Sequence, residues 1–293
     1  MKKKFLDPNL KNKSKTVEEK IQLYEYNKIS YPLPTEIEIS ESGVCNRKCS
    51  FCPRSDPSFV ERKEFITNDL HLKLCKELEQ LNYKGTIRYS GFVEPLLDKN
   101  IFNLIEMARE FVPSSNIELV TNGDVLNKKR LIKLFNKGLN KILISAYDDK
   151  KTAEQLENLC KDAKLNKSQY IVRHRYLSEE NDFGITLSNR SGLMENAEFK
   201  IKSLKEPLKK PCYIPSYTFF LDYQGDVLMC PHDWGKKIIL GNLKKEKLID
   251  IWFSKKSVSI RKMLNNNNRN FTPCNVCDVD GTLMGKKNSI YFN

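Results

Sequence analysis

Between residues 35 and 176 the chain alternates short runs of β-branched and aromatic residues with stretches in which leucine and isoleucine recur at helical spacing. The short runs predict five strands, at residues 35–40, 85–90, 116–121, 141–146 and 168–175. The stretches between them predict four amphipathic helices. Strands that alternate with helices are typical of a parallel sheet with crossover helices, so we predict an α/β fold of the TIM-barrel type.

A sixth strand-like run, residues 184–189, follows the fifth too closely for a parallel crossover, which takes roughly a dozen residues. We therefore expect a hairpin there and a partial (β/α) barrel of five or six strands. After Gly192 the alternation stops and prolines recur. These changes predict a basic N-terminal extension over residues 1–34, a barrel over 35–194 and a small cysteine-rich domain over 195–293.

Two local patterns lie outside the barrel. Residues 17–27 have the composition of a helix that could lean on the barrel. Residues 219–230, FFLDYQGDVLMC, predict two short strands around a Gln-Gly turn. Such a hairpin would deliver Cys230, the last residue of this run.

Composition limits the class of protein. A chain of 293 residues can bury a core without disulfides, and no apolar run approaches the ~20 residues that span a bilayer. We therefore expect a cytoplasmic protein with no membrane partner, in which the nine cysteines stay reduced and serve as metal ligands, catalytic groups or core residues. The net charge of +13 raises nucleic acid as a partner, but lysine is spread along the whole chain, which favours a background bias.

Three cysteines crowd the segment CNRKCSFCP, at Cys45, Cys49 and Cys52. Thiolates bind zinc or iron–sulfur clusters, and structural zinc takes four ligands, usually in two separated pairs. The next histidine or cysteine is His71, in a predicted helix. Three thiolates in one loop suit a 4Fe-4S cluster that keeps one iron open; a zinc or oxidised-cysteine site completed from elsewhere is the alternative.

Four further cysteines, Cys212, Cys230, Cys274 and Cys277, form a complete ligand set that ends in a CxxC pair. Four thiolates make a closed site, either structural zinc or a fully ligated 4Fe-4S cluster. Cys75 and Cys160 lie among leucines on predicted helix faces, where a small buried apolar residue is the simpler interpretation.

The Cys-x3-Cys-x2-Cys motif after the first strand, YSGFVEPLLD after the second and TNG after the third together resemble the radical S-adenosylmethionine (SAM) enzymes. The later cysteines, with YQGDVLMCPHDW and LGNLKKEKLIDIW between them, resemble the twitch domain, a shortened SPASM domain that carries one auxiliary cluster. A short barrel with such a domain is similar to the aminocyclitol dehydrogenases of this family.

The resemblance implies roles for individual residues. Cys45, Cys49 and Cys52 would ligate the SAM-cleaving cluster, and the second cysteine set would hold the auxiliary 4Fe-4S cluster, with zinc as the lesser alternative. The SAM contacts that it implies are Phe51, Gly91, Glu94, Thr121, Asn122 and Ser145. Apart from the resemblance, Arg173 and His174 fall on opposite faces of the fifth predicted strand, so one of them can reach the barrel interior, and His232 follows a cluster ligand by two residues. Arg173 and His232 are therefore candidates for acid–base or substrate contacts. The family's Gly-Gly-Glu segment is Phe92-Val93-Glu94 here.

The reaction that this implies is removal of a hydrogen atom from a small polar substrate, a sugar, aminocyclitol or similar alcohol, followed by oxidation through the auxiliary cluster. An external donor such as flavodoxin or ferredoxin would supply the electron that starts it. Epimerisation, or modification of a ribosomal peptide or tRNA, is the alternative within the family. A zinc-stapled basic nucleic-acid-binding protein is the alternative of another class.

Overall fold

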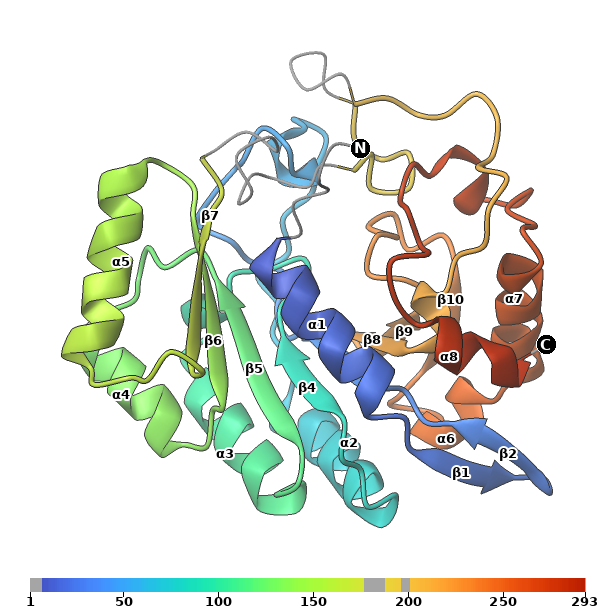
Figure 1. The fold of residues 1–293 in the computed structure, drawn as a ribbon, viewed down its shortest axis with the longest axis horizontal. Helices are drawn as coiled ribbons and strands as arrows, with labels where there is room; N and C mark the ends of the chain where they lie inside the picture. Colours follow the sequence, from blue (N-terminus) through green and yellow to red (C-terminus); the bar gives the residue numbers. More distant parts are fainter. Residues whose placement is uncertain (1–6, 177–187, 196–200, 293) are drawn as a thin grey trace.

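A single eight-stranded sheet organises the protein (Figure 1). The computed structural model describes residues 7–176, 188–195 and 201–292. Five neighbouring strands run parallel and follow one another in chain order. They are β3 (Glu36–Ser40), β4 (Thr86–Tyr89), β5 (Asn116–Thr121), β6 (Lys141–Ala146) and β7 (Tyr170–His174). The five strands predicted from the sequence are thus confirmed.

The crossover helices cover the outer face of this sheet (Figure 1). They are α2 (Asn68–Gln80), α3 (Ile101–Phe111), α4 (Lys128–Asn136) and α5 (Lys150–Asp162). Thr67, Asn127 and Asp149 cap three of them by accepting a hydrogen bond from a backbone N–H of the first turn. Alternate strand residues such as Ile37 and Ile39 point outward and pack beneath the helices in the main core. The predicted partial α/β barrel is confirmed.

The sheet continues into the C-terminal part of the chain. Strand β8 (Thr218–Asp222) pairs parallel with β3, and β9 (Asp226–Leu228) and β10 (Ile239–Asn242) extend the sheet antiparallel. The predicted hairpin is therefore present, with Gly225 at a φ of 90° in its turn. The sequence predicts a domain boundary near residue 195, but strands from both sides of that residue belong to this one sheet. The strand expected at 184–189 falls mainly on residues 184–187, outside the described part.

Shorter helices complete the C-terminal part. They are α6 (Leu248–Trp252), α7 (Lys255–Asn265) and α8 (Lys286–Ser289), with the 3₁₀ turns Ile214–Ser216, Cys274–Val276 and Ile290–Phe292. Two further 3₁₀ turns, Pro53–Ser55 and Pro95–Leu97, follow β3 and β4. Among residues 7–176, 188–195 and 201–292, no helix combines the length and apolar composition needed to cross a membrane.

The N-terminal segment folds differently from the expectation. Helix α1 spans Pro8–Glu19, and a hairpin of β1 (Leu23–Tyr26) and β2 (Ile29–Pro32) follows it, so the helix predicted over 17–27 is wrong. Asp7 caps α1 and Pro8 occupies its first turn, a combination that favours a helix start at this point. Tyr26 lies against Phe253, with ring centroids 4.9 Å apart, which anchors the hairpin to the C-terminal part.

The inner face of the sheet is charged, and α1 covers it (Figure 1). Arg88 on β4 binds Glu36 on β3 at 2.8 Å and Glu118 on β5 at 2.7 Å. From α1, Lys13 reaches Glu36 at 2.5 Å and Asn12 donates to Glu118 at 3.1 Å. Buried charges need partners, and α1 supplies polar partners to them while it covers the open side of the barrel.

We expect Arg88→Met to lower the free energy of unfolding by about 3–5 kcal/mol, because it leaves two buried carboxylates without their shared partner. Urea unfolding followed by circular dichroism measures the change. Lys137→Met is the control, since it breaks the half-exposed pair with Glu106 and should cost less than about 1 kcal/mol. Equal effects of the two substitutions would contradict this view of the barrel interior.

Candidate active site

A cavity of about 1220 Å³ opens at the carboxyl ends of the parallel strands. The loops after β3, β4 and β5 line it on one side, and α1 and the C-terminal part line it on the other. Parallel α/β sheets place their chemistry at this edge. All the residues that the sequence implicates at the first cluster and the SAM site lie on its wall: Cys45, Cys49, Phe51, Cys52, Gly91, Glu94, Thr121, Asn122 and Ser145.

The loop after β3 carries the first three cysteines, each half-buried. Its path is set by the buried guanidinium of Arg54, which donates to the carbonyls of Gly43 at 2.8 Å and Phe92 at 2.7 Å. The backbone N–H of Cys52 donates to the carbonyl of Cys49 at 2.9 Å. The loop is therefore folded back on itself with its thiols toward the cavity.

Arg47, between the first two cysteines, ties the same loop to the ends of two other strands. Its guanidinium binds Asp124 after β5 at 2.5 Å and Asp148 after β6 at 2.8 Å. Asn46 donates to Asp124 as well, at 2.6 Å. These contacts join the cysteine loop to the rim of the barrel.

The chemistry of the thiols suits a metal cluster. Burial, and then the neighbouring Cys52 and Cys45, raise the pKa of Cys49 to about 11. Adjacent thiolates are costly to bury without positive charge, and metal ions supply that charge when thiolates bind them. The residues present therefore fit a cluster held by three thiolates.

Glu94 joins the loop after β4 to the end of β5. It is 2% exposed, and its carboxylate accepts hydrogen bonds from the Thr121 hydroxyl at 2.6 Å and the backbone N–H groups of Asn122 at 2.7 Å and Leu96 at 3.1 Å. Gly91, at a φ of 99°, leaves no room for a Cβ, which would lie 2.9 Å from the Phe220 ring. The glycine therefore lets the segment after β4 pack closely against Phe220 and Ser40.

The fifth strand divides its side chains as expected. Arg173 faces the cavity and donates to the Ser145 hydroxyl at 2.6 Å, while His174 lies on the other face against Tyr176. Burial, and then the nearby Arg175, lower the pKa of Arg173 to about 10. Both candidate residues on the strand are therefore placed, and only Arg173 reaches the cavity.

His232 lies on the part of the cavity wall formed by the C-terminal part. Burial, and then Arg190 and Lys13, lower its pKa to about 3, so the imidazole is neutral. Its Nδ1 lies 3.4 Å from the Ser188 hydroxyl. Trp234 packs nearby against Phe92 with the two rings tilted, their centroids 4.3 Å apart.

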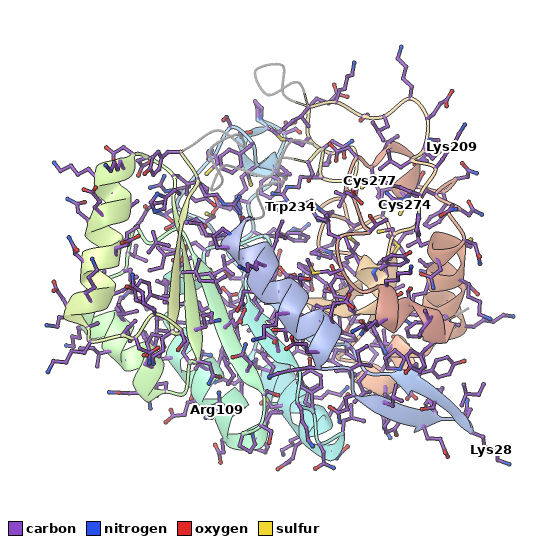
Figure 2. All side chains as sticks on the ribbon, viewed as in Figure 1. Lys28, Arg109, Lys209, Trp234, Cys274 and Cys277 are labelled. Atoms are coloured by element: carbon purple, nitrogen blue, oxygen red, sulfur yellow. The ribbon has the colours of Figure 1, made fainter. Side chains whose placement is uncertain are left out.

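The second set of cysteines is buried beside the same cavity. Cys212, Cys230, Cys274 and Cys277 are 7–9% exposed. Figure 2 places Cys274 and Cys277 in the C-terminal part. Cys212, Cys230 and Cys274 lie in one buried cluster of side chains. Burial, and then Cys212, raise the pKa of the Cys230 thiol. A Cβ on Gly281 would lie 2.2 Å from the Cys212 sulfur, which explains the glycine.

A cluster also fits this second set. A 4Fe-4S cluster held by protein alone takes four thiolates, one on each iron, and the four buried free cysteines supply that number. The cavity wall includes Pro231, Asp278 and Gly281, which adjoin these cysteines. Cys75 and Cys160 lie in the main core, as the sequence predicts.

Several residues of the cavity wall are not found from the sequence. Asp7 and Lys13 come from the segment before the barrel, and Trp234 from the C-terminal part. Glu38 on β3 also lines the cavity, and Ser90 donates to it at 2.7 Å. Only Glu38 carries a signal in the sequence, because the alternation in TEIEIS places its acidic residues on one face of the strand.

Comparison with known proteins identifies the class. The model of the radical SAM superfamily matches residues 39–181, and the SPASM model, an iron-sulfur cluster-binding domain, matches residues 212–278. The chain belongs to the radical SAM superfamily and carries a SPASM domain. It is therefore an enzyme that uses S-adenosylmethionine and 4Fe-4S clusters, including an auxiliary one.

Individual relatives narrow the comparison. The chain is 31% identical over 240 residues to S-adenosyl-L-methionine-dependent 2-deoxy-scyllo-inosamine dehydrogenase of Niallia circulans, covering 80% of this chain and 88% of that one. The crystal structure of BtrN in complex with AdoMet and 2-DOIA is similar, with a TM-score of 0.72 and 27% identity over 87% of this chain and 97% of that one. GTP 3',8-cyclase of Staphylococcus epidermidis is 32% identical over 124 residues, which cover 41% of this chain and 35% of the cyclase.

We expect Glu94→Gln to weaken SAM binding by about 10-fold to 100-fold, because an amide cannot accept the same three hydrogen bonds with a full negative charge. Equilibrium binding of SAM to the reconstituted protein, without reductant, measures the change. Glu110→Gln, at an exposed position on α3, should leave SAM affinity unchanged. Wild-type affinity in Glu94→Gln would exclude Glu94 from the SAM site.

Proposed function

We propose that Cys45, Cys49 and Cys52 hold the 4Fe-4S cluster that binds SAM through its open iron. When bound and reduced there, SAM supplies the 5′-deoxyadenosyl radical that removes a hydrogen atom from the substrate. The support is the half-buried loop of three thiols on the cavity wall. Gly91, Glu94, Thr121, Asn122, Ser145 and Phe51 are the proposed SAM contacts.

The second set, Cys212, Cys230, Cys274 and Cys277, holds the auxiliary 4Fe-4S cluster in this proposal. Four protein thiolates leave no open iron, so this site does not bind substrate through a vacant position. The observation that carries the function is that one cavity runs from the first three cysteines to the neighbours of the second set. A substrate there can meet SAM on one side and an electron acceptor on the other.

The function best supported is oxidation of an alcohol on a small polyol ring, a sugar or an aminocyclitol. The relative from Niallia circulans is named for the dehydrogenation of 2-deoxy-scyllo-inosamine, and the chain covers most of its length. The protein holds the carbinol carbon near SAM and excludes water, since a primary carbon radical reacts with what is close. Arg173 and His232 are candidates to contact the alcohol or take its proton.

This chemistry requires one further partner. Reduction of the first cluster needs an external electron donor, and we propose flavodoxin or ferredoxin in the cytoplasm. The exposed Lys48 lies on the cysteine loop and gives this donor a positive charge near the first three cysteines.

Iron and sulfide content with a Mössbauer spectrum, on protein reconstituted without oxygen, tests the cofactor set. Two 4Fe-4S clusters require about eight irons per chain and no zinc. About four irons with one zinc would retain SAM cleavage and remove the internal electron acceptor.

Any one of the substitutions Cys45→Ala, Cys49→Ala and Cys52→Ala should abolish formation of 5′-deoxyadenosine and leave about four irons per chain, because the first cluster loses a ligand. Chromatography of the products with dithionite as reductant measures this. Cys75→Ala, on the buried face of α2, should retain activity. Continued formation of 5′-deoxyadenosine in any of the three variants would end the proposal.

Cys274→Ala should keep measurable SAM cleavage and lose the oxidised product, because only the electron acceptor is damaged. The ratio of ketone product to 5′-deoxyadenosine reports this directly. A wild-type ratio in this variant would make the second site structural at most.

A further inference from the structure

Helix α1 lies outside the part of the chain that the superfamily model matches, which begins at residue 39. It nevertheless lines the active-site cavity through Asn9, Leu10 and Lys13. In Figure 1 it crosses between the parallel strands and the C-terminal part. The cavity is therefore completed by an element that comes before the matched barrel in the chain.

The ammonium of Lys13 occupies the floor of the cavity. Its side chain is 12% exposed, and its Nζ lies 2.5 Å from Glu36 and 5.6 Å from the centre of the Tyr217 ring. The same positive charge acts on Glu38 of the barrel and on His232 of the C-terminal part. Lys13 thus stands between the two halves of the site.

Other residues fix α1 in place. Asn12 donates to Glu118, and Lys141 donates to Asn12 at 2.5 Å. Val17 packs in the core that contains Cys212, and Glu18 accepts a hydrogen bond from the N–H of Gly285 at 2.7 Å. The position of Lys13 therefore does not depend on its own contact with Glu36 alone.

An ammonium has three N–H donors, and Glu36 takes one of them. A donor group fixed on the wall of a polar cavity can bind an oxygen of a ligand. It also repels a ligand ammonium at the same place. Lys13 therefore distinguishes an oxygen substituent from an amine at one position of the substrate ring.

We propose that Lys13 is a substrate-positioning residue, and that α1, which lines this side of the cavity, determines which substituent the substrate ring carries there. Lys13 binds a hydroxyl, carboxylate or phosphate oxygen of the ring, at a position away from the carbon that is oxidised. The substrate carries no amine at that position. This inference rests on the proposed oxidation of a ring alcohol and adds the substituent that the site selects.

The test compares Lys13→Met with wild type on two probes, scyllo-inositol and 2-deoxy-scyllo-inosamine. We expect KM for scyllo-inositol to rise about 10-fold to 100-fold, the effect of losing a charged hydrogen bond, with kcat changed far less. KM for the amine-bearing ring should rise less or fall. Lys13→Arg should restore part of the affinity for scyllo-inositol, because the charge and the donors return.

Two controls separate positioning from structure. Lys11→Met removes an exposed charge from the same helix and should leave KM unchanged. Asn12→Ala weakens the attachment of α1 to the barrel without touching the cavity, so it reports loosening of the helix alone. Formation of 5′-deoxyadenosine without substrate, and the visible spectrum of the clusters, should match wild type in every variant.

Four other results would overturn either the inference about Lys13 or the proposed function. If Lys13→Met keeps the wild-type KM for scyllo-inositol, or if wild type oxidises only the amine-bearing ring, the inference about Lys13 fails and the proposed function stands. If Asn12→Ala raises KM as much as Lys13→Met, the effect is structural and the inference fails. If wild type oxidises neither ring while cleaving SAM, the proposed cyclitol oxidation fails and this inference fails with it.

Discussion

The buried ion pairs of Arg88 with Glu36 and Glu118 determine how the inside of the barrel is built. Charges at this depth cannot face an apolar filler, so the element that closes the open side must bring polar groups of its own. Helix α1 does this with Asn12 and Lys13. The polar interior continues into the active-site cavity, so the charges that neutralise one another in the sheet also shape the site for an oxygen-rich ligand.

Two buried groups then align the loops at the strand ends. Arg54 joins the cysteine loop to the carbonyl of Phe92, and Glu94 joins the segment after β4 to Thr121 and Asn122 at the end of β5. Both work through backbone or short side-chain partners, which hold the geometry tightly. The cysteine loop and the proposed SAM contacts are thus parts of one hydrogen-bonded unit. A substitution of Glu94 should therefore also shift the cysteine loop.

The sequence predicts the barrel and the cysteine sets well because both signals are local. Apolar residues repeat every second position in the strands, and thiol ligands come at short spacings. The helix α1 gives no such signal, because the face that it buries carries Asn12 and Lys13, which look like a solvent-exposed surface. The parallel pairing of β8 with β3 joins residues far apart in the chain, and periodicity contains no information about it.

That pairing fixes the distance between the two halves of the site. The first three cysteines follow β3, and Cys230 follows the hairpin that begins with β8. Both cysteine sets are therefore attached to strands that are hydrogen-bonded neighbours in one sheet. Helix α1 links the two halves of the site as well. Val17 packs in the core that contains Cys212, and Asn12 of the same helix donates to Glu118 in the barrel. A substrate must therefore match a span that is set by backbone pairing, and Lys13 of α1 lies on the wall of the cavity within that span.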